Sequence, residues 1–323
     1  MAQKFDVVIR GSTPLAALLA GLLASVHGRR IALASDGNAA FGLVRDIDLS
    51  AALFTRPATW ELLQAATPET IRLIEKMGAR TALGRCDAIF VAETEAGREV
   101  LGHFGHMSAG FGQIAERLSD GGFVPDAAAL RLRDVTLINR SLLQPRMEAW
   151  LDQAGVVRSG GDLEATMVVL ADDTAILAHG LVEPLGEIAM NSVLTEPLPP
   201  LRAPVLNFID RAGLLMQRAD RSVIGVGHGD IGATLAHGQV AHRAGESHFR
   251  GVFSRDGAPV IGPLAAGGPM VFAGLGTVGA FLAPVLARLI AGDATPAEQA
   301  WCLAHAPTAN RAVIAEFVPG EPL

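Results

Sequence analysis

The sequence predicts an α/β protein in which a parallel sheet packed between helices is interleaved with a second part built on an antiparallel sheet. Three observations predict this fold class. Asp6–Asp36 reads as strand, glycine turn, helix and strand, and Met270–Gly292 reads as strand, glycine turn and helix. Glu187–His228 contains short apolar runs separated by Pro, Gly or Asp, the pattern of antiparallel strands joined by turns. Strands that alternate with helices favour a parallel sheet.

The N-terminal segment is a βαβ unit with the chemistry of a dinucleotide site. Phe5–Ile9 is a β-branched run fit for a buried strand, Gly11 breaks it, and Leu15–Val26 is an apolar run of helix formers. A helix that starts there offers backbone N–H groups and a positive dipole end to a pyrophosphate. The Rossmann fingerprint G-x-G-x-x-G/A reads Gly11, Thr13 and Ala16 here. A βαβ unit without a ligand therefore explains the motif about equally well.

The residues expected at the ligand lie in the turn and after the second strand, Arg30–Ala34. Pro14 suits the first turn of a helix, and Ala16 permits close packing of the helix on the strand. Asp36 is the candidate acceptor for ribose hydroxyls. The candidate phosphate turn consists of Gly11, Ser12, Thr13 and Pro14.

A second glycine-rich segment lies at the other end of the chain. Gly251–Pro263 reads Gly-Val-Phe-Ser-Arg-Asp-Gly-Ala-Pro-Val-Ile-Gly-Pro. Met270–Gly292 begins as a buried strand, turns at Gly274, Gly276 and Gly279, and continues as a helix that starts at these glycines. The sequence therefore predicts another helix N-terminus with its backbone exposed.

Together the two ends resemble the D-amino-acid-oxidase-like superfamily of FAD-dependent oxidoreductases. In that family a D-G-x-P-x-I-G-P turn and a G-x-G-x-x-G-x-x-x-A-P helix start return the C-terminus to the N-terminal unit. The matching residues are Asp256, Gly257, Pro259, Ile261, Gly262 and Pro263, followed by Ala273 through Pro284. The resemblance implies a Rossmann-type FAD-binding domain of residues 1–41, 123–178 and 251–323, and a substrate domain of residues 42–122 and 179–250. It places the isoalloxazine end of FAD at Gly274, Leu275, Gly276, Thr277, Val278 and Gly279.

The intervening elements follow from local pattern. Phe41–Arg85 is expected to be mostly helical, with one helix capped at Thr67 and ended by Gly78. The glycines of Gly102–Gly112 predict a flexible loop, so its His103 and His106 are expected to be solvated or hydrogen-bonded and not to bind a metal. Further expected elements are the strand Cys86–Ala92, the helix Arg140–Ala154 and the strand Thr166–Ala171.

Composition excludes several classes of function. The 323 residues carry a net charge of −7 with no basic cluster, which argues against nucleic-acid binding. No apolar segment is long enough to span a bilayer, and Cys86 and Cys302 form neither a disulfide framework nor a metal-ligand set. Half of the residues are apolar, enough for a sizeable core. The default compartment is the cytoplasm.

The substrate residues are inferred from the resemblance. Relatives that act on amino acids place an arginine ahead of the D-G turn, where its guanidinium binds the substrate carboxylate bidentately. Arg250 is the nearest match, with Arg255 and Arg218 in reserve, and a solvated arginine at a helix end explains Arg250 about equally well. His228 ends a predicted strand and is the second catalytic candidate, although a structural role is favoured for a histidine in that place.

The leading hypothesis is an FAD-dependent oxidoreductase that oxidises a C–N bond of a small-molecule substrate, an amino acid or amine, by hydride transfer to the flavin. The alternative is a flavin-fold protein without catalysis that serves as a partner subunit or maturation factor. Five departures from the family motivate it: Thr13, the short connection Val156–Met167, the pair Asp172 and Asp173 in place of an A-T-G continuation, the lack of tyrosine, and a chain expected to be short for a complete member of the family. A nicotinamide-linked enzyme is weaker, since it gives the C-terminal glycines no role.

Overall fold

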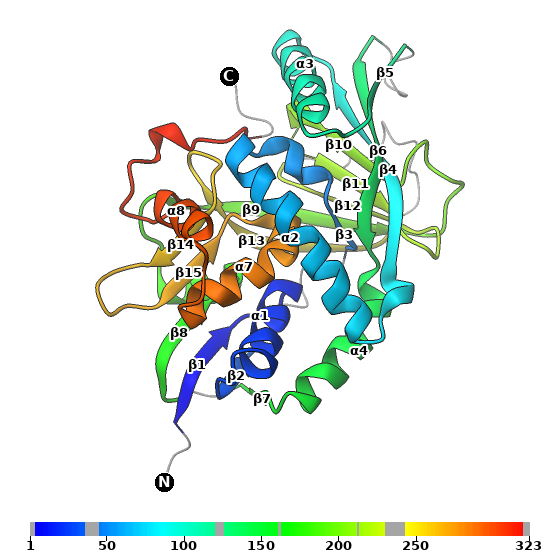
Figure 1. Cartoon of the computed structure of the whole chain (residues 1–323). Coiled ribbons are helices and arrows are strands. Elements are labelled where there is room, and N and C mark those ends of the chain that lie inside the picture. Colours follow the sequence, from blue (N-terminus) through cyan, green and yellow to red (C-terminus); the bar gives the residue numbers. More distant parts are fainter. Residues whose placement is uncertain are drawn as a thin grey trace.

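The computed structural model describes residues 4–35, 45–119, 126–160, 163–211, 213–229 and 243–318. These residues form two sheets with helices packed between and around them (Figure 1). The fold class is therefore the predicted one, a parallel sheet with helices joined to an antiparallel sheet.

The first sheet is parallel except at one edge. Among the described residues it has six strands in the order β14-β15-β8-β1-β2-β7, and only the pair β14 and β15 is antiparallel. Its strands are β1 (Phe5–Arg10), β2 (Ile31–Ala34), β7 (Val157–Ser159), β8 (Ala165–Leu170), β14 (Val260–Pro263) and β15 (Met270–Ala273). The N-terminal and C-terminal glycine segments thus contribute to one sheet, as expected from the resemblance.

The second sheet is mostly antiparallel and has nine strands within the described ranges. Its path runs β13-β9-β12-β11-β10-β4-β6-β3, with β5 paired to β6, and only β10 and β4 are parallel. The strands are β3 (Ile47–Asp48), β4 (Leu83–Ala92), β5 (Ala115–Leu118), β6 (Ala128–Ile138), β9 (Leu185–Thr195), β10 (Val205–Phe208), β11 (Gly213–Gln217), β12 (Val223–Gly227) and β13 (Arg243–Ser254).

Sheet membership departs from the predicted domain division at two strands. β6 falls within residues 123–178, the segment assigned to the first domain, yet it pairs along its length with β4 of the second sheet. β13 crosses the boundary at residue 250 as one continuous strand. Both strands are long, and their ladder hydrogen bonds extend the second sheet past the points at which the motif-based boundaries were set.

α1 packs against α7 and α4, and α7 in turn packs against α2 and α8 (Figure 1). α1 is buried on nearly all sides, and a Cβ on Gly21 would lie 2.1 Å from the Trp150 ring of α4, so only glycine allows that approach. α2 crosses α7 and is joined to it by the Thr70 hydroxyl, which donates to the Phe281 carbonyl at 3.0 Å. The helices are α1 (Pro14–Ser25), α2 (Pro57–Lys76), α3 (Glu95–Gly110), α4 (Arg140–Gln153), α5 (Asp173–His179), α7 (Gly279–Ala291) and α8 (Pro296–Ala304).

Two local predictions are wrong. α2 starts at Pro57 and continues through Pro68, so Thr67 is not an N-cap; its hydroxyl donates to the Leu63 carbonyl at 2.6 Å inside the helix. The expected loop over residues 102–112 is largely helix α3, whose N-cap is the Thr94 side chain. Burial of one apolar side of each helix outweighs the intrinsic cost of the interior proline and glycines.

The structure describes the histidine and cysteine side chains that the sequence analysis considered as candidate metal or disulfide sites. His103 and His106 are exposed on α3, and no group of three or more metal-ligating side chains occurs in the described ranges. Cys86 and Cys302 are free and buried, and burial raises the pKa of each thiol to about 12. Of the helices described, none alone is long and apolar enough to cross a bilayer. Gly276–Ala291 and Pro296–Ala304, bent by 97°, pass such a test only as a pair.

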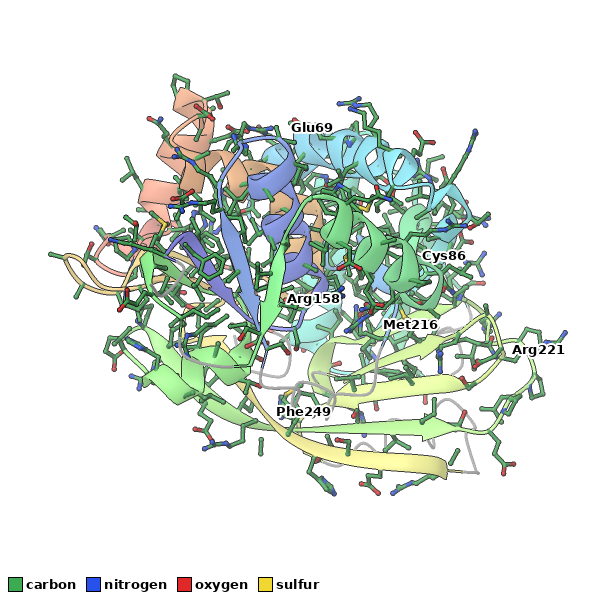
Figure 2. The ribbon with its side chains drawn as sticks, turned by 90° about the horizontal axis from the view of Figure 1, so that it is seen from below. Glu69, Cys86, Arg158, Met216, Arg221 and Phe249 are labelled. Atoms are coloured by element: carbon green, nitrogen blue, oxygen red, sulfur yellow. The ribbon has the colours of Figure 1, made fainter. Side chains whose placement is uncertain are left out.

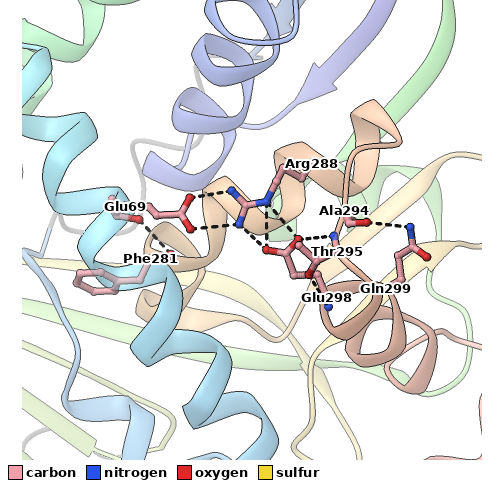
Figure 3. Close-up of polar contacts among 8 residues, drawn as sticks. Glu69, Phe281, Arg288, Ala294, Thr295, Glu298 and Gln299 are labelled. Atoms are coloured by element: carbon pink, nitrogen blue, oxygen red, sulfur yellow. Dashed lines mark hydrogen bonds and ion pairs between the residues drawn. The ribbon is translucent and has the colours of Figure 1, made fainter.

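One charged cluster fixes α7 to its neighbours (Figure 3). The Arg288 guanidinium of α7 donates to Glu69 of α2 at 2.7 Å and to Glu298 of α8 at 3.1 Å. Glu298 also accepts the Thr295 N–H at 2.8 Å and so completes the capping box of α8. The two carboxylates hold the pKa of Arg288 above its ordinary value.

We expect Arg288→Met to lower the free energy of unfolding by about 2 kcal/mol, because it leaves two partly buried carboxylates without their cation. Denaturant titration followed by tryptophan fluorescence measures the change. Arg158→Met is the matched control, since Arg158 makes an exposed ion pair with Asp152 and its loss should have a much smaller effect. Equal losses in the two variants would contradict the structural role of the cluster.

Candidate functional site

A cavity of about 820 Å³, the inner cavity, lies between the two glycine turns and the second sheet. One wall comes from the start of α1 and from the turn before α7, and the opposite wall from β9, β12 and β13. In Figure 2, β9 and β13 run side by side below the parallel sheet, with Phe249 of β13 labelled. The residues used below line it: Ser12, Thr13, Arg45, Arg140, Asp172, Asp173, Phe249, Arg250, Gly274, Gly276 and Thr277.

A second cavity of about 1020 Å³, the outer cavity, reaches Gly11, Ser35 and Gly160 at the carboxyl ends of β1, β2 and β7. This is the edge at which open parallel sheets bind ligands. Asp172, Thr174 and Ala178 line both cavities. The two cavities therefore meet at the start of α5, directly beside the predicted phosphate turn.

The predicted phosphate turn joins β1 to α1, and its donors are partly occupied. Gly11 has φ 152°, and a Cβ there would lie 3.2 Å from both Ala16 Cβ and Asp172 Cγ, so glycine is required. The Thr13 side chain is the N-cap of α1: its Oγ1 accepts the Ala16 N–H at 3.3 Å and donates to the Ala171 carbonyl at 3.1 Å. Pro14 follows at the first helical position and has no N–H.

Asp172 binds the same turn. Its Oδ2 accepts the Ser12 N–H at 2.8 Å and the Ser12 hydroxyl at 3.3 Å, while its Oδ1 accepts the Ala175 N–H at 2.8 Å as the N-cap of α5. The sequence suggested that two acids here would repel a pyrophosphate unless they faced away. Asp172 faces the turn and is 9% exposed, so it presents its charge where a phosphate is expected.

The Asp173 side chain points away from the phosphate turn and toward the second sheet. It accepts the N–H of Val252 on β13. Burial raises the pKa of Asp173 to about 6; the hydrogen bond opposes that rise, and the charge of Asp172 adds to it. The two neighbouring acids therefore have different roles: one binds the phosphate turn, and the other lies against the second sheet.

The C-terminal glycine turn leaves open space in the inner cavity. Gly274 and Gly276 have φ of 69° and 49°, and a Cβ on Gly276 would meet no atom within 4 Å. Thr277 is anchored by Arg45, whose guanidinium donates to Thr277 Oγ1 at 3.3 Å and to Asp48 at 2.7 Å. The turn thus presents its backbone to the inner cavity at Gly276, with open space beside it.

Arg140 is a functional candidate that sequence reasoning missed. It lines the inner cavity, and its guanidinium has no hydrogen bond or ion pair with any residue that the structure describes. Burial lowers its pKa, opposed only by the charge of Asp46, which accepts the Arg140 N–H at 2.8 Å. A cation in the first turn of a helix faces the positive dipole end. This unfavourable position, an arginine at the start of a predicted helix, was the signal in the sequence from which Arg140 could have been identified.

The predicted site residues fall into three groups. Ser12, Thr13, Pro14, Gly274, Leu275, Gly276, Thr277 and Arg250 line the inner cavity, and Gly11 lines the outer one. Arg250 is exposed and already paired with Glu187 at 3.1 Å. Asp36 lies outside the described residues. The remaining predicted or reserve residues line neither cavity, namely His228, Val278, Gly279, Arg218 and Arg255.

The fold is shared with amino acid oxidases and dehydrogenases of known structure. Glycine oxidase from Geobacillus kaustophilus superposes with TM-score 0.73 at 17% identity over 91% of this chain and 96% of its own. L-proline dehydrogenase from P. horikoshii gives 0.71 at 13% identity, covering 95% and 98%. NikD, an amino acid oxidase essential for nikkomycin biosynthesis, gives 0.73 at 14% identity over 100% of both chains.

Comparisons of sequence add nothing to this similarity: no protein-family model and no curated protein matches the chain. The chain therefore has the fold that the two glycine segments indicated, and the similarity extends over nearly all of its length.

The raised pKa of Asp173 predicts a pH-dependent stability. The folded-state pKa of Asp173, about 6, exceeds its ordinary value of 3.8. The protonated carboxyl group therefore contributes fully to the stability of the fold below pH 3.8, and this contribution is lost as the pH rises to 6. The ionised group then lowers the free energy of unfolding by about 3 kcal/mol. We expect Asp173→Asn to gain stability relative to the natural chain across this interval, measured by denaturant titration at several pH values. A pH-independent difference would contradict the assignment.

Proposed function

We propose that this chain is an FAD-dependent oxidoreductase that oxidises a C–N bond of a small amino acid or amine bearing a carboxylate. One observation carries the proposal: two glycine turns from opposite ends of the chain line one cavity, together with the partly buried Arg140 guanidinium, which has no partner among the described residues. The shared fold of several amino acid oxidases and dehydrogenases supports it.

The residues present fit the ring end of a flavin better than its pyrophosphate. Gly276 leaves open space beside the turn, in which a flat ring can lie. At the other end, the Ser12 N–H is available to a phosphate only when Asp172 releases it. The cofactor is thus expected to span both cavities, with its pyrophosphate passing Ser12 and Thr13.

The protein's own residues bind and orient the substrate in this proposal. Bound FAD supplies the hydride acceptor. Arg140 donates to the substrate carboxylate, because its guanidinium lines the cavity and is unpaired within the part of the chain that the structure describes. Phe249 of β13 lines the wall of the cavity opposite the two glycine turns. Fixing the reacting carbon by its carboxylate supplies the orientation that hydride transfer requires.

A non-catalytic subunit is the second candidate, and one observation favours it. Asp172 already binds the donor that a pyrophosphate would use. If Asp172 never releases Ser12, the chain keeps the fold but binds no FAD. Its function would then depend on a partner subunit. Flavin binding separates the two candidates.

We expect the purified protein to bind added FAD, seen as quenching of flavin fluorescence. Gly276→Val is expected to abolish this binding, because the new side chain fills the open space beside the turn. Gly292→Val is the matched control: Gly292 also has positive φ, at 84°, with open space around it, but lies at the end of α7 outside both cavities.

The outcomes of that experiment separate strain from occupation of the site. Both variants carry the cost of a β-branched residue at positive φ, so a loss confined to Gly276→Val assigns the ring site to this turn. A protein that refuses FAD under all conditions would overturn the enzyme proposal and favour the subunit.

We expect Arg140→Met to lower kcat/KM for carboxylate-bearing substrates by roughly 30-fold, which corresponds to about 2 kcal/mol for a hydrogen bond to a charged group. The readout is anaerobic flavin bleaching with a panel of amino acids and of the matching amines that lack the carboxylate. Amines should show no change. Arg250→Met is the control, because Arg250 is exposed and paired with Glu187. A larger loss in Arg250→Met would return the carboxylate to the residue predicted from the sequence.

A further inference from the structure

Asp172 joins two structural elements that a dinucleotide would have to pass between. Its two carboxylate oxygens are divided between the Ser12 N–H, before α1, and the Ala175 N–H, at the start of α5. The Ser12 hydroxyl adds a third contact at 3.3 Å. Since Asp172 lines both cavities, a ligand that occupies both must pass this carboxylate.

The turn has few other donors for an anion. The Gly11 N–H donates to the Ala34 carbonyl at 3.0 Å, and the Ala16 N–H donates to the Thr13 side chain. Pro14 has none. With Ser12 bound by Asp172, the described residues of the turn leave at most the N–H groups of Thr13 and Leu15 for a ligand. The site that would bind a pyrophosphate is therefore largely satisfied by the chain itself.

The charge of Asp172 opposes the same ligand. A pyrophosphate at Ser12 would approach an ionised carboxylate that the protein holds in place with three hydrogen bonds. Two negative charges that lie close together repel strongly in a partly buried site. A neutral ring in the inner cavity would not meet this repulsion, because it carries no charge.

We propose that Asp172 sets the cofactor affinity of this chain: its carboxylate takes the place of a pyrophosphate on the Ser12 N–H, so that FAD binds only by displacing it. This inference rests on the proposed function and adds to it that FAD is held weakly and exchanges. It also predicts that the chain discriminates between flavins with and without phosphates, since a flavin without phosphates does not compete with Asp172.

Asp172→Asn tests the proposal while keeping the N-cap. The single amide oxygen can accept the Ala175 N–H, as asparagine does at helix N-termini, and its amide NH₂ cannot accept from Ser12. FAD affinity, measured by fluorescence quenching with the full chain, is expected to rise at least tenfold. Riboflavin, which has no phosphate, is expected to bind the natural chain and the variant equally. Asp172→Ser also caps α5 and serves if the asparagine variant does not fold.

Asp173→Asn is the matched control, because it removes a neighbouring carboxylate that makes no contact with Ser12 in the described structure. It should change FAD affinity by less than threefold. An equal gain in Asp173→Asn would overturn the proposal, since general charge and not occupation of the turn would then explain the effect. Unchanged FAD affinity in Asp172→Asn would also overturn it.

The failure of this inference is distinguishable from failure of the proposed function. If the natural chain already binds FAD tightly and Asp172→Asn changes nothing, the inference falls and the enzyme proposal stands. If no variant binds FAD or riboflavin, both fall. If riboflavin affinity rises together with FAD affinity, the pyrophosphate is not the group that Asp172 excludes, and the inference falls alone.

Discussion

The close packing of α7 on α1 is the contact on which the rest of the structure depends. Gly279 allows it, because a Cβ there would lie 3.3 Å from the Leu15 side chain and 2.9 Å from Leu275. It brings the starts of two helices from opposite ends of the chain to one cavity, each beside a glycine turn. The Arg288 cluster and the hydrogen bond from Thr70 then fix α7 to α2 and α8. Separating these helix starts would disrupt the wall of the inner cavity that the two glycine turns form together.

Much of the fold could be predicted from the sequence because its strongest elements are local and apolar. β1, α1, β8, α4 and α7 occur close to their expected ranges, since each is a buried run that ends at a glycine or at a polar cap. The errors arose where tertiary burial outweighed local preference. Pro68 lies inside α2, and the glycines of α3 are tolerated because Phe104 and its neighbours are buried. Such contacts join distant segments, which a periodic pattern does not record.

The candidate site was less predictable for the same reason. The glycine turns follow from motif alone, but the contact between Ser12 and Asp172 joins residues 160 positions apart. From the sequence, Asp172 and Asp173 were one acidic pair; in the fold they face different walls, and only one of them contacts the turn. Arg140 became a candidate once the absence of any partner within the described residues was known. Local sequence therefore indicates which backbone forms the site, whereas its charges are arranged by distant contacts.

The contact between Gly21 and Trp150 has a consequence for spectroscopy. The chain has no tyrosine and three tryptophans, Trp60, Trp150 and Trp301, which lie in α2, α4 and α8. Trp150 covers Gly21 on α1, Trp60 stacks on Phe111, and the Trp301 indole donates to Thr59 at 3.1 Å. Intrinsic fluorescence therefore comes almost entirely from the helical layer. It reports the assembly of these helices around α1 and α7, and it carries little information about the nine-stranded sheet.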